Sequence, residues 1–436
     1  MSGIAEVLLN LGYQISGSDL KASEVTERLE KLGAKISYGH HEKNVGNAQV
    51  VVISTAVKDE NPEVVCSKKL KIPVIPRIEM LCELARLKYT IAVAGTHGKT
   101  TTTSMIAFIF QEGGLEPTFV VGGKLHHLQS GAQLGNGEFL VAEADESDGS
   151  FLKLSPTIGI ITNIDNDHLD YYKTIKNLRS AFIQFANRVP FYGCSILCGE
   201  DRGAASILPS LKRRVITYGL DRAWDYSAAN ISVSPEGTNF SVLYRGKNIG
   251  PIRLKLFGKH SILNALAACA CGLELKIPFE KIAQSLEKFE SVARRLEVKG
   301  EKNSVVWVDD YGHHPTEIKA TLSALREKFP AKKLVVFFQP HRYSRTKLLL
   351  KEFAGSFKDA DEVILLPIYP AGEKPIAGVS SKALLPLLKK NGINASFLNG
   401  SQSRDLKGYL KAGTVFLTLG AGDVWKIGQQ FFAPVD

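Results

Sequence analysis

A glycine-rich segment between two apolar stretches carries the residue types needed to hold a triphosphate. Residues 94–103 read AGTHGKTTTT; they follow the apolar run 89–93, which predicts a buried strand, and precede 104–110, which predicts a helix. The backbone N–H groups of such a loop and the helix N-terminus face an anion. The lysine can reach the β- and γ-phosphates, and the next hydroxyl can bind Mg²⁺. The predicted nucleotide contacts are Gly95, Thr96, His97, Gly98, Lys99, Thr100 and Thr101.

The spacing of this loop departs from the commonest phosphate-loop pattern, because Gly95 stands only three residues before Gly98. The alternative is a glycine-rich turn that opens an ordinary helix. The strand before the loop and the helix after it favour the phosphate-binding interpretation.

Acidic residues follow another strand-like run, FLV, and could hold magnesium. Residues 143–148 read EADESD, and a carboxylate such as Glu143 near a phosphate loop suits Mg²⁺, directly or through water. The alternative is a solvated acidic loop. His168 follows the strand-like run 157–162. An imidazole is a less usual neighbour of Mg²⁺, and His168 could equally cap a helix or lie in the core.

Three polar segments in the last third of the chain each follow a predicted strand. In open α/β sheets, ligands bind at the carboxyl ends of the strands, so three such segments at one edge indicate a site. Taken singly, each is also ordinary turn chemistry. The segments are DDYGHHP at 309–315 after strand 305–308, QPHRYSRT at 339–346 after strand 334–338, and GAGD at 420–423 after strand 414–418, with a further strand predicted at 362–366.

The N-terminal region predicts a smaller nucleotide-binding fold. Helices are expected at 4–11 and 24–32, and strands at 13–16 and 50–54. Ser18 and Asp19 come directly after the first of these strands, where an acidic residue can accept a ribose hydroxyl. The alternative is that Asp19 caps the next helix or turn.

Strands and helices alternate throughout the chain, which predicts an α/β protein with parallel sheets. A length of 436 residues exceeds a single core, and we expect domains at 1–88, 89–292 and 293–436. The net charge of +10 suits acidic ligands such as nucleotides. Lys and Arg are spread along the chain without an aromatic-interleaved basic stripe, which argues against nucleic acid. No signal peptide or transmembrane run is visible, and the six cysteines lack a CxxC pair, so a cytoplasmic protein with reduced thiols is expected.

In order, GTHGKTTTT, AEADESD, TNIDNDHLD, GKHSILNALAA, ARRLE, DDYGHHPTEI, QPHRYSRT and GAGD closely resemble the motifs of the Mur ligases of peptidoglycan synthesis. The resemblance runs from residue 2 nearly to the C-terminus. It implies a Rossmann-like N-terminal domain for the UDP moiety, a P-loop-type central ATPase domain with ATP and Mg²⁺, and a Rossmann-like C-terminal domain for the amino acid.

Within the family, the resemblance implies ATP-dependent joining of L-alanine to the lactyl carboxylate of UDP-N-acetylmuramate through an acyl phosphate. Positioning and charge neutralisation would then dominate catalysis. The implied roles are phosphate and magnesium contacts for Lys99 and Thr100, magnesium ligation for Glu143 and His168, adenine contact for Asn264 with His260 nearby, charge stabilisation for Arg295 and Arg342, and the amine site for Tyr311 and His313.

The first residues depart from the family pattern. Relatives begin with a strand and a loop of the form GxGGxGM, and Met1-Ser2-Gly3 resembles the end of that loop. We therefore expect the true start to lie upstream, because the first strand of a Rossmann-type sheet lies in its middle and the glycine loop supplies donors to a pyrophosphate.

Three other functions remain as alternatives. A murein-peptide ligase, which joins a recycled tripeptide to the same nucleotide sugar, tends to have Phe-Ala where this chain has Tyr311-Gly312. A non-catalytic nucleotide-binding paralogue is disfavoured, since the motifs of the second and third regions are intact. An NAD-dependent dehydrogenase would leave the loop at Gly95 unexplained.

Overall fold

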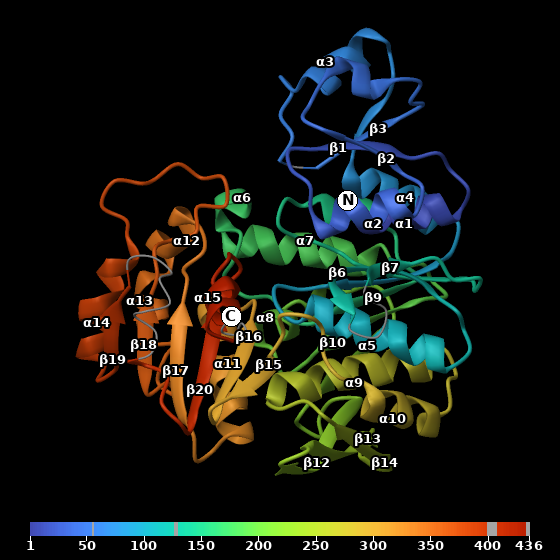
Figure 1. Ribbon diagram of the computed structural model, residues 1–436. Coiled ribbons are helices and arrows are strands. Elements are labelled where there is room, and N and C mark those ends of the chain that lie inside the picture. The colour runs from blue at the N-terminus through green and yellow to red at the C-terminus, as the bar shows by residue number, and fades with distance from the viewer. Residues whose placement is uncertain (55, 126–129, 399–407, 433–436) are drawn as a thin grey trace. The chain divides into compact units, whose positions relative to one another are not determined.

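The computed structural model describes residues 1–54, 56–125, 130–398 and 408–432, and its contacts divide the chain into two compact units (Figure 1). The first unit comprises Met1–Asn230, Phe240–Ile252 and Leu263–Phe289. The second comprises Ile231–Asn239, Arg253–Ile262 and Glu290–Asp436. Both are α/β, as predicted. Among the helices described, none combines the length and apolar character needed to span a bilayer.

The first 88 residues alternate helices with short parallel strands. β1 pairs with β2 and β3 pairs with β4, as two separate two-stranded sheets. The elements are α1 (Ser2–Asn10), β1 (Ser16–Asp19), α2 (Glu24–Lys31), β2 (Lys35–Tyr38), the 3₁₀ helix η1 (Glu42–Val45), β3 (Val51–Ile53), α3 (Pro62–Lys69), β4 (Val74–Pro76) and α4 (Arg77–Arg86).

The strand predicted at 13–16 lies three residues later in the structure, at Ser16–Asp19. Gly12 has a φ of +88°, and its N–H donates to the carbonyl of Leu9 at 2.9 Å. The Tyr13 N–H donates to Leu8 at 3.0 Å. These bonds finish α1 with a left-handed glycine cap, so the strand begins only at Ser16. Ser18 and Asp19 therefore lie inside β1, at its carboxyl end, and do not follow it.

The rest of the first unit is built on a large, mainly parallel sheet with the order β14-β13-β12-β11-β10-β9-β5-β8-β6-β7. β12, β13, β14 and α9 contribute residues to both units. The elements are β5 (Tyr89–Ala94), α5 (Lys99–Glu112), β6 (Thr118–Leu125), β7 (Ser130–Gln133), β8 (Phe139–Glu143), η2 (Ser150–Lys153), β9 (Ile158–Ile161), α6 (Leu169–Tyr172), α7 (Ile175–Asn187), β10 (Cys194–Cys198), α8 (Arg202–Ala205), η3 (Leu208–Ser210), β11 (Val215–Gly219), β12 (Tyr226–Ser234), β13 (Gly237–Tyr244), β14 (Lys247–Leu254), α9 (Lys259–Glu274) and α10 (Phe279–Lys288).

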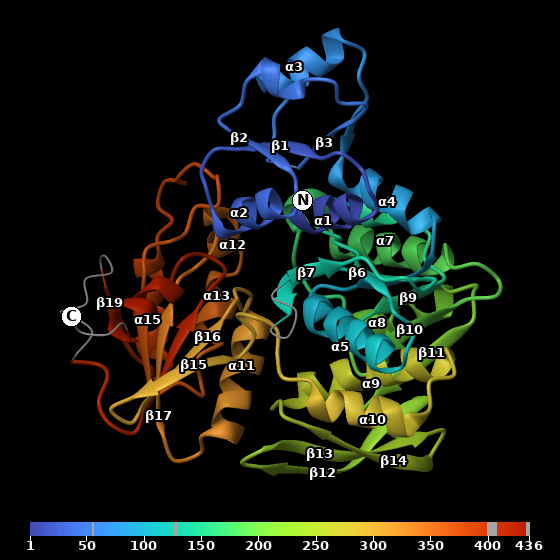
Figure 2. The same ribbon diagram turned by 45° about the vertical axis from the view of Figure 1, so that its right-hand side comes forward.

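Helices cover both faces of this sheet, which explains why its central strands are apolar throughout. Alternate residues of β5 face opposite sides: Ala92 and Ala94 belong to a core with α1, α4 and α7. α5 packs against β5, β6 and β8. Figure 1 and Figure 2 both show α4 and α7 on one side of the sheet and α5 on the other. This sandwich fixes the carboxyl ends of β5, β8 and β9 side by side.

The second unit contains a six-stranded sheet with the order β15-β16-β20-β17-β18-β19. β15 is antiparallel to β16, and the other neighbours are parallel. The elements are β15 (Glu297–Lys302), β16 (Val305–Asp310), α11 (Pro315–Lys328), β17 (Lys333–Phe338), α12 (Tyr343–Leu348), α13 (Leu350–Ala354), β18 (Glu362–Leu365), η4 (Ser381–Ala383), α14 (Leu384–Lys390), β19 (Asn394–Phe397), β20 (Thr414–Leu419) and α15 (Trp425–Phe432).

The predicted strands of this unit are confirmed, with small changes at their ends. β16 extends through Asp309 and Asp310, which the sequence placed in the following turn. Both aspartates pair with β20, so their backbone is ordered by the sheet. Residues of β20 alternate between two cores: Leu417 packs with α11, α13 and α14, and Phe416 packs with α15.

Leu417→Ala tests this core. Its side chain is fully buried, and truncation removes apolar contacts and leaves a cavity, which should lower the free energy of unfolding by about 2–5 kcal/mol. Leu348→Ala, at a leucine that is 56% exposed in the same unit, should change it by less than about 0.5 kcal/mol. Urea unfolding followed by circular dichroism measures both. Equal effects would contradict the packing described.

Candidate active site

The loop after β5 bends where only glycine fits. Gly95 and Gly98 have φ angles of +130° and +80°, which side chains rarely adopt. A Cβ on Gly95 would also lie 2.1 Å from Thr162 Oγ1, and one on Gly98 would lie 2.8 Å from Asn264 Oδ1. The left-handed Gly98 is the N-cap of α5, so the helix begins at Lys99 and not at the predicted Ser104.

The segment after β9 clamps this loop. Asn163 accepts the His97 N–H through Oδ1 at 2.8 Å and donates through Nδ2 to the His97 carbonyl at 2.9 Å. Thr162 Oγ1 donates to the same carbonyl at 2.6 Å. The Asp165 N–H donates to Thr96 Oγ1 at 2.9 Å. β5 and β9 are adjacent parallel strands, so both loops emerge at one edge and hold each other in place.

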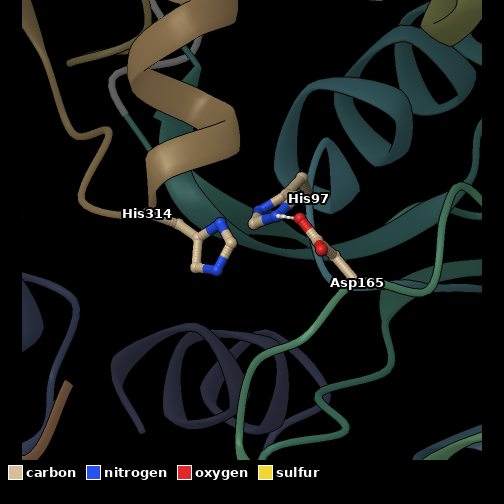
Figure 3. Close-up of side chains that lie close together, drawn as sticks. All are labelled: His97, Asp165 and His314. Atoms are coloured by element: carbon tan, nitrogen blue, oxygen red, sulfur yellow. Dashed lines mark hydrogen bonds and ion pairs between the residues drawn. The ribbon is translucent and has the colours of Figure 1, made fainter. Parts of the chain in front are cut away.

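The ring of His97 contacts a carboxylate of the clamp. Its Nε2 lies 3.0 Å from Asp165 Oδ2 (Figure 3). Together with the backbone bonds, this contact orients the loop at both its main chain and its side chain. Thr162, Asn163 and Asp165 were not assigned a role from sequence, although their position after a strand next to β5 was the available signal.

The side chain of Lys99 is held by oxygens of the loop and of a neighbouring carboxylate. Its Nζ donates to the Gly95 carbonyl at 2.6 Å and to the Thr96 carbonyl at 3.2 Å, and lies 2.9 Å from Glu146 Oε2. Burial disfavours the ammonium, but the carboxylates of Glu146 and Asp145 outweigh it and raise the pKa of Lys99. Lys99 thus stays cationic in a site where an anion can replace some of these oxygens.

Glu146 is a completely buried carboxylate that the sequence reasoning left without an individual role. Burial raises its pKa, against the opposing charge of Lys99. His168 Nε2 lies 3.6 Å from Glu146 Oε1, and the Tyr172 hydroxyl donates to the Glu146 carbonyl at 2.6 Å. Glu146 therefore joins the loops after β8 and β9.

The three predicted magnesium ligands come from adjacent elements. Thr100 lies in the first turn of α5, next to Thr101, and Glu143 ends β8. Glu143 Oε1 accepts the Gly122 N–H at 2.8 Å, at a glycine where a Cβ would lie 2.9 Å from the other carboxylate oxygen. His168 has a φ of +57° and occupies the N-cap position of α6, where its side chain makes no capping hydrogen bond.

The predicted adenine contacts both lie on α9. Asn264 is buried, and its side chain lies directly over Gly98 of the loop. His260 belongs to the second unit by its contacts. Burial, with help from Arg295, lowers the pKa of His260 to about 4.

Ser18 and Asp19, the two candidate residues of the N-terminal region, differ in their hydrogen-bond partners. Ser18 Oγ donates to Glu63 Oε2 at 2.7 Å. Asp19 is exposed, and its Oδ1 accepts the Leu20 N–H at 2.7 Å. The turn interaction that was the alternative for Asp19 is therefore present.

In the second unit, the three polar segments predicted at one sheet edge do converge. Gln339 Nε2 donates to Asp423 Oδ1 at 2.9 Å, and the Gly420 N–H donates to the Asp310 carbonyl at 3.0 Å. The Arg294 guanidinium bonds Asp309 Oδ2 at 2.9 Å and the Gly420 carbonyl at 2.7 Å. Arg294 therefore ties two of the segments together, a role the sequence reasoning missed.

Aromatic and cationic side chains form a row at this edge. The guanidinium of Arg295 lies 5.3 Å from the Tyr311 ring centre, and the Tyr311 ring lies 5.5 Å from that of His313. His313 is also 5.5 Å from His341, which stacks on Tyr369. Burial lowers the pKa of His313 to about 3, so its ring is neutral at neutral pH and the positive charge of the row comes from arginine.

Arg342 has a backbone conformation that is rare for a side-chain-bearing residue. Its φ is +68° with a ψ of +141°, and its N–H donates to the Tyr369 carbonyl at 2.9 Å. Such outliers cluster at functional sites. Among the described residues, its Nε is buried and has no hydrogen-bond partner.

The glycine loop with its clamp, and the sheet edge lined by arginine and neutral imidazole, lie in a chain that belongs to the Mur ligase family. Family profiles match residues 1–89 (Mur ligase family, catalytic domain), 93–272 (Mur ligase middle domain) and 294–422 (Mur ligase, glutamate ligase domain).

Individual relatives point to one member of the family. UDP-N-acetylmuramate–L-alanine ligase of Endomicrobium trichonymphae is 53% identical over 99% of this chain and 96% of its own length, and that of Geobacter sulfurreducens is 52% identical over 100% and 95%. The crystal structure of UDP-N-acetylmuramate–alanine ligase from Thermotoga maritima has a TM-score of 0.83 and 31% identity, covering 99% of this chain and 95% of that one. A murein peptide ligase from Psychrobacter arcticus shares the fold, with a TM-score of 0.74 at 23% identity, covering 100% of this chain and 97% of that one.

Gly95→Ala tests the close approach at the phosphate loop. The added Cβ overlaps Thr162 Oγ1 and forces the loop away from its clamp. Overpacking of about 1–3 kcal/mol should weaken binding of a fluorescent ATP analogue by roughly tenfold or more. Gly355→Ala, where the nearest atom is 3.7 Å away, should bind normally. Wild-type affinity in Gly95→Ala would refute the clamp.

Asp310→Asn tests the charge state of a buried carboxyl. Burial raises the pKa of Asp310 to about 6, although two backbone N–H groups donate to it at 2.7 Å. Between about pH 4 and 6, the folded state keeps a proton that the unfolded state has released, so the free energy of unfolding falls as pH rises.

The wild type should therefore lose about 3 kcal/mol relative to Asp310→Asn across this interval. Urea unfolding at several pH values measures the difference in slope. Glu352→Gln, at an exposed position of the same unit, should keep the wild-type slope. An Asp310→Asn profile parallel to the wild type would rule out the raised pKa.

Proposed function

We propose that this protein uses ATP to join L-alanine to the lactyl carboxylate of UDP-N-acetylmuramate. The observation that carries the proposal is identity of 52–53% over nearly the whole chain to ligases named for this reaction, combined with a clamped phosphate loop around a buried lysine. The identity extends over 99–100% of this chain, and so over both units.

The chemistry requires activation of a carboxylate, because an amine cannot expel oxide. A carboxylate oxygen attacks the γ-phosphorus of ATP, ADP leaves, and an acyl phosphate forms. The amine of L-alanine attacks the carbonyl carbon, and the tetrahedral intermediate expels phosphate as the C–O bond breaks. The protein's part is to position the reactants and stabilise their charge.

Lys99 is the residue that meets the transferred phosphoryl group. Its Nζ is already within the loop, and a triphosphate replaces the carbonyl and carboxylate oxygens that now hold it. Because Glu146 and Asp145 raise its pKa, Lys99 is charged when the nucleotide arrives. Thr96, His97, Thr100 and Thr101 line the same anion site, and Asn264, with His260, contacts the adenine.

Magnesium fits the donor set at this edge. The hydroxyl of Thr100 and the carboxylate of Glu143 offer the oxygen ligands that Mg²⁺ prefers, and His168 is the third, less usual member. When bound, the ion neutralises phosphate charge. The bond from the Gly122 N–H fixes Glu143, and the contact with Glu146 fixes His168.

The three regions of the chain divide the substrates among them. Residues 1–88 take the UDP moiety, with Ser18 and Asp19 at the carboxyl end of β1; residues 89–292 take ATP; residues 293–436 take L-alanine. Arg295 and Arg342 neutralise phosphate and carboxylate charge, and Tyr311 and His313 line the place where the amine attacks. The neutral ring of His313 leaves the positive charge to these arginines.

The test is phosphate release from ATP in the presence of UDP-N-acetylmuramate, with and without L-alanine, together with mass spectrometry of the product. We expect alanine-dependent release and a product heavier by one alanyl residue. The tripeptide substrate of murein-peptide ligases should give no product. Product with the tripeptide and none with L-alanine would overturn the substrate assignment, and ATP binding without any amide would overturn the activity.

Lys99→Ala is expected to lower the rate of phosphate release by roughly a thousandfold or more, as loss of a charge that stabilises the phosphoryl transition state does. Lys153→Ala, at an exposed lysine paired with Glu79 in the same unit, should retain wild-type rates. Activity of Lys99→Ala within about tenfold of wild type would contradict the role given to this lysine.

A further inference from the structure

One carboxylate, that of Glu63, gathers the polar side chains at the carboxyl ends of β1 and β2. Glu63 Oε2 accepts the Ser18 hydroxyl at 2.7 Å and lies 3.6 Å from His40 Nδ1. Glu63 Oε1 accepts Asn44 Nδ2 at 2.7 Å and the His41 N–H at 3.4 Å. Both oxygens of the carboxylate thus face hydrogen-bond donors.

The local sequence Asn61-Pro62-Glu63 fixes this carboxylate. Asn61 is the N-cap of α3, and its Oδ1 accepts the Glu63 N–H at 2.9 Å. Pro62 occupies the first helical position, where its missing N–H costs nothing. Glu63 then lies in the first turn, where the helix dipole stabilises a negative charge. The side chain is half-buried, so its carboxylate competes little with water for these hydrogen bonds.

Glu63 also joins two sheets that share no strand pairing in residues 1–54 and 56–88. α3 follows β3 of one sheet, whereas Ser18 lies near the carboxyl end of β1 and Asn44 follows β2 of the other sheet. The carboxyl ends of parallel strands are where ligands bind in such folds. The Glu63 contacts therefore order the side chains at this edge.

The bonds to Glu63 also set the hydrogen positions of its neighbours. The single hydroxyl hydrogen of Ser18 goes to Glu63. The contact of 3.0 Å between Ser18 Oγ and His40 Nδ1 then needs the hydrogen on Nδ1. In the neutral ring this leaves Nε2 as an acceptor, which suits the hydroxyl or N–H donors of a uridine.

We propose that Glu63 is a positioning residue for the nucleotide sugar, acting through Ser18, His40 and Asn44. The inference rests on the proposed function and deepens it, because it names the group that orders the UDP-binding edge. Glu63 itself does not touch the reacting carboxylate. It governs the affinity for the uridine nucleotide and leaves phosphoryl transfer unchanged.

A carboxylate is required at position 63 because both of its oxygens accept hydrogen bonds, so a side chain that places an NH₂ group there would face another donor. In Glu63→Gln the amide NH₂ faces either Ser18, whose hydroxyl must then turn toward His40, or Asn44, whose own NH₂ cannot accept. Glu63→Gln should therefore weaken binding by about tenfold, and Glu63→Ala by roughly ten- to a hundredfold, as expected for hydrogen bonds to a charged group.

Isothermal titration with UDP-N-acetylmuramate, without ATP or L-alanine, measures this affinity directly. Asp59→Asn removes an exposed carboxylate just ahead of α3, paired with Lys68, and should bind as the wild type does. In steady state, Glu63→Gln should raise the KM for the nucleotide sugar and leave kcat and the KM for ATP within about twofold. Unchanged affinity in Glu63→Gln and Glu63→Ala would overturn the proposal.

A double-mutant cycle separates positioning from general destabilisation. Because Glu63 acts partly through Ser18, the affinity loss of Glu63→Gln combined with Ser18→Ala should fall short of the product of the single losses. Independent, multiplicative losses would overturn the positioning role, as would a fall in kcat with an unchanged KM.

The titration also distinguishes this inference from the proposed function. If the wild type binds the nucleotide sugar more tightly than the Glu63 variants but forms no amide, the ligase activity is refuted and the role of Glu63 is supported. If the wild type forms the amide and the Glu63 variants bind the nucleotide sugar as tightly as the wild type does, only the present inference is refuted.

Discussion

The contact of Gly95 with the segment after β9 is the constraint on which the rest of the ATP site depends. With the loop this close to Thr162, the side-chain amide of Asn163 can bond both the N–H and the carbonyl of His97. The loop then turns at Gly98, α5 begins at Lys99, and the lysine points into the loop. A side chain on Gly95 would keep the loop away from Thr162 and so prevent the contacts that follow from this approach. One backbone approach thus sets the helix start, the position of the phosphate-binding lysine and the spacing of the neighbouring loops.

Charge is managed differently in the two units. Around Lys99, carboxylates raise the pKa of a buried ammonium, so a cation is stored where a triphosphate is to bind. In the second unit, burial keeps the imidazole of His313 neutral, and fixed guanidinium groups supply the charge. Arg294 is used structurally, because it bonds Asp309 and the Gly420 carbonyl. This division suits a reaction in which the enzyme binds and stabilises charged groups and forms no covalent bond of its own.

The sequence predicted the fold class, the strand–loop–helix unit and the convergence of three polar segments, because these depend on local periodicity and on the shared edge of parallel strands. It misplaced β1, since Gly12 ends α1 with a cap that delays the strand. It also missed the partners that join loops at the ends of neighbouring strands: Thr162 and Asn163 against the loop after β5, and Arg294 between the segments after β16 and β20. Such contacts join residues far apart in the chain, and no spacing rule reveals them. The roles given to Glu143, His168 and Arg342 remain proposals that the geometry supports.

The most direct test of the central claim follows an oxygen atom. UDP-N-acetylmuramate labelled with ¹⁸O in its lactyl carboxylate is incubated with ATP, L-alanine and the protein, and the phosphate released is examined by ³¹P NMR. The acyl-phosphate route predicts phosphate carrying one ¹⁸O atom, because the bridging oxygen leaves with phosphorus when the amine displaces it. Amide formation with unlabelled phosphate, or with ¹⁸O in AMP, would contradict the account.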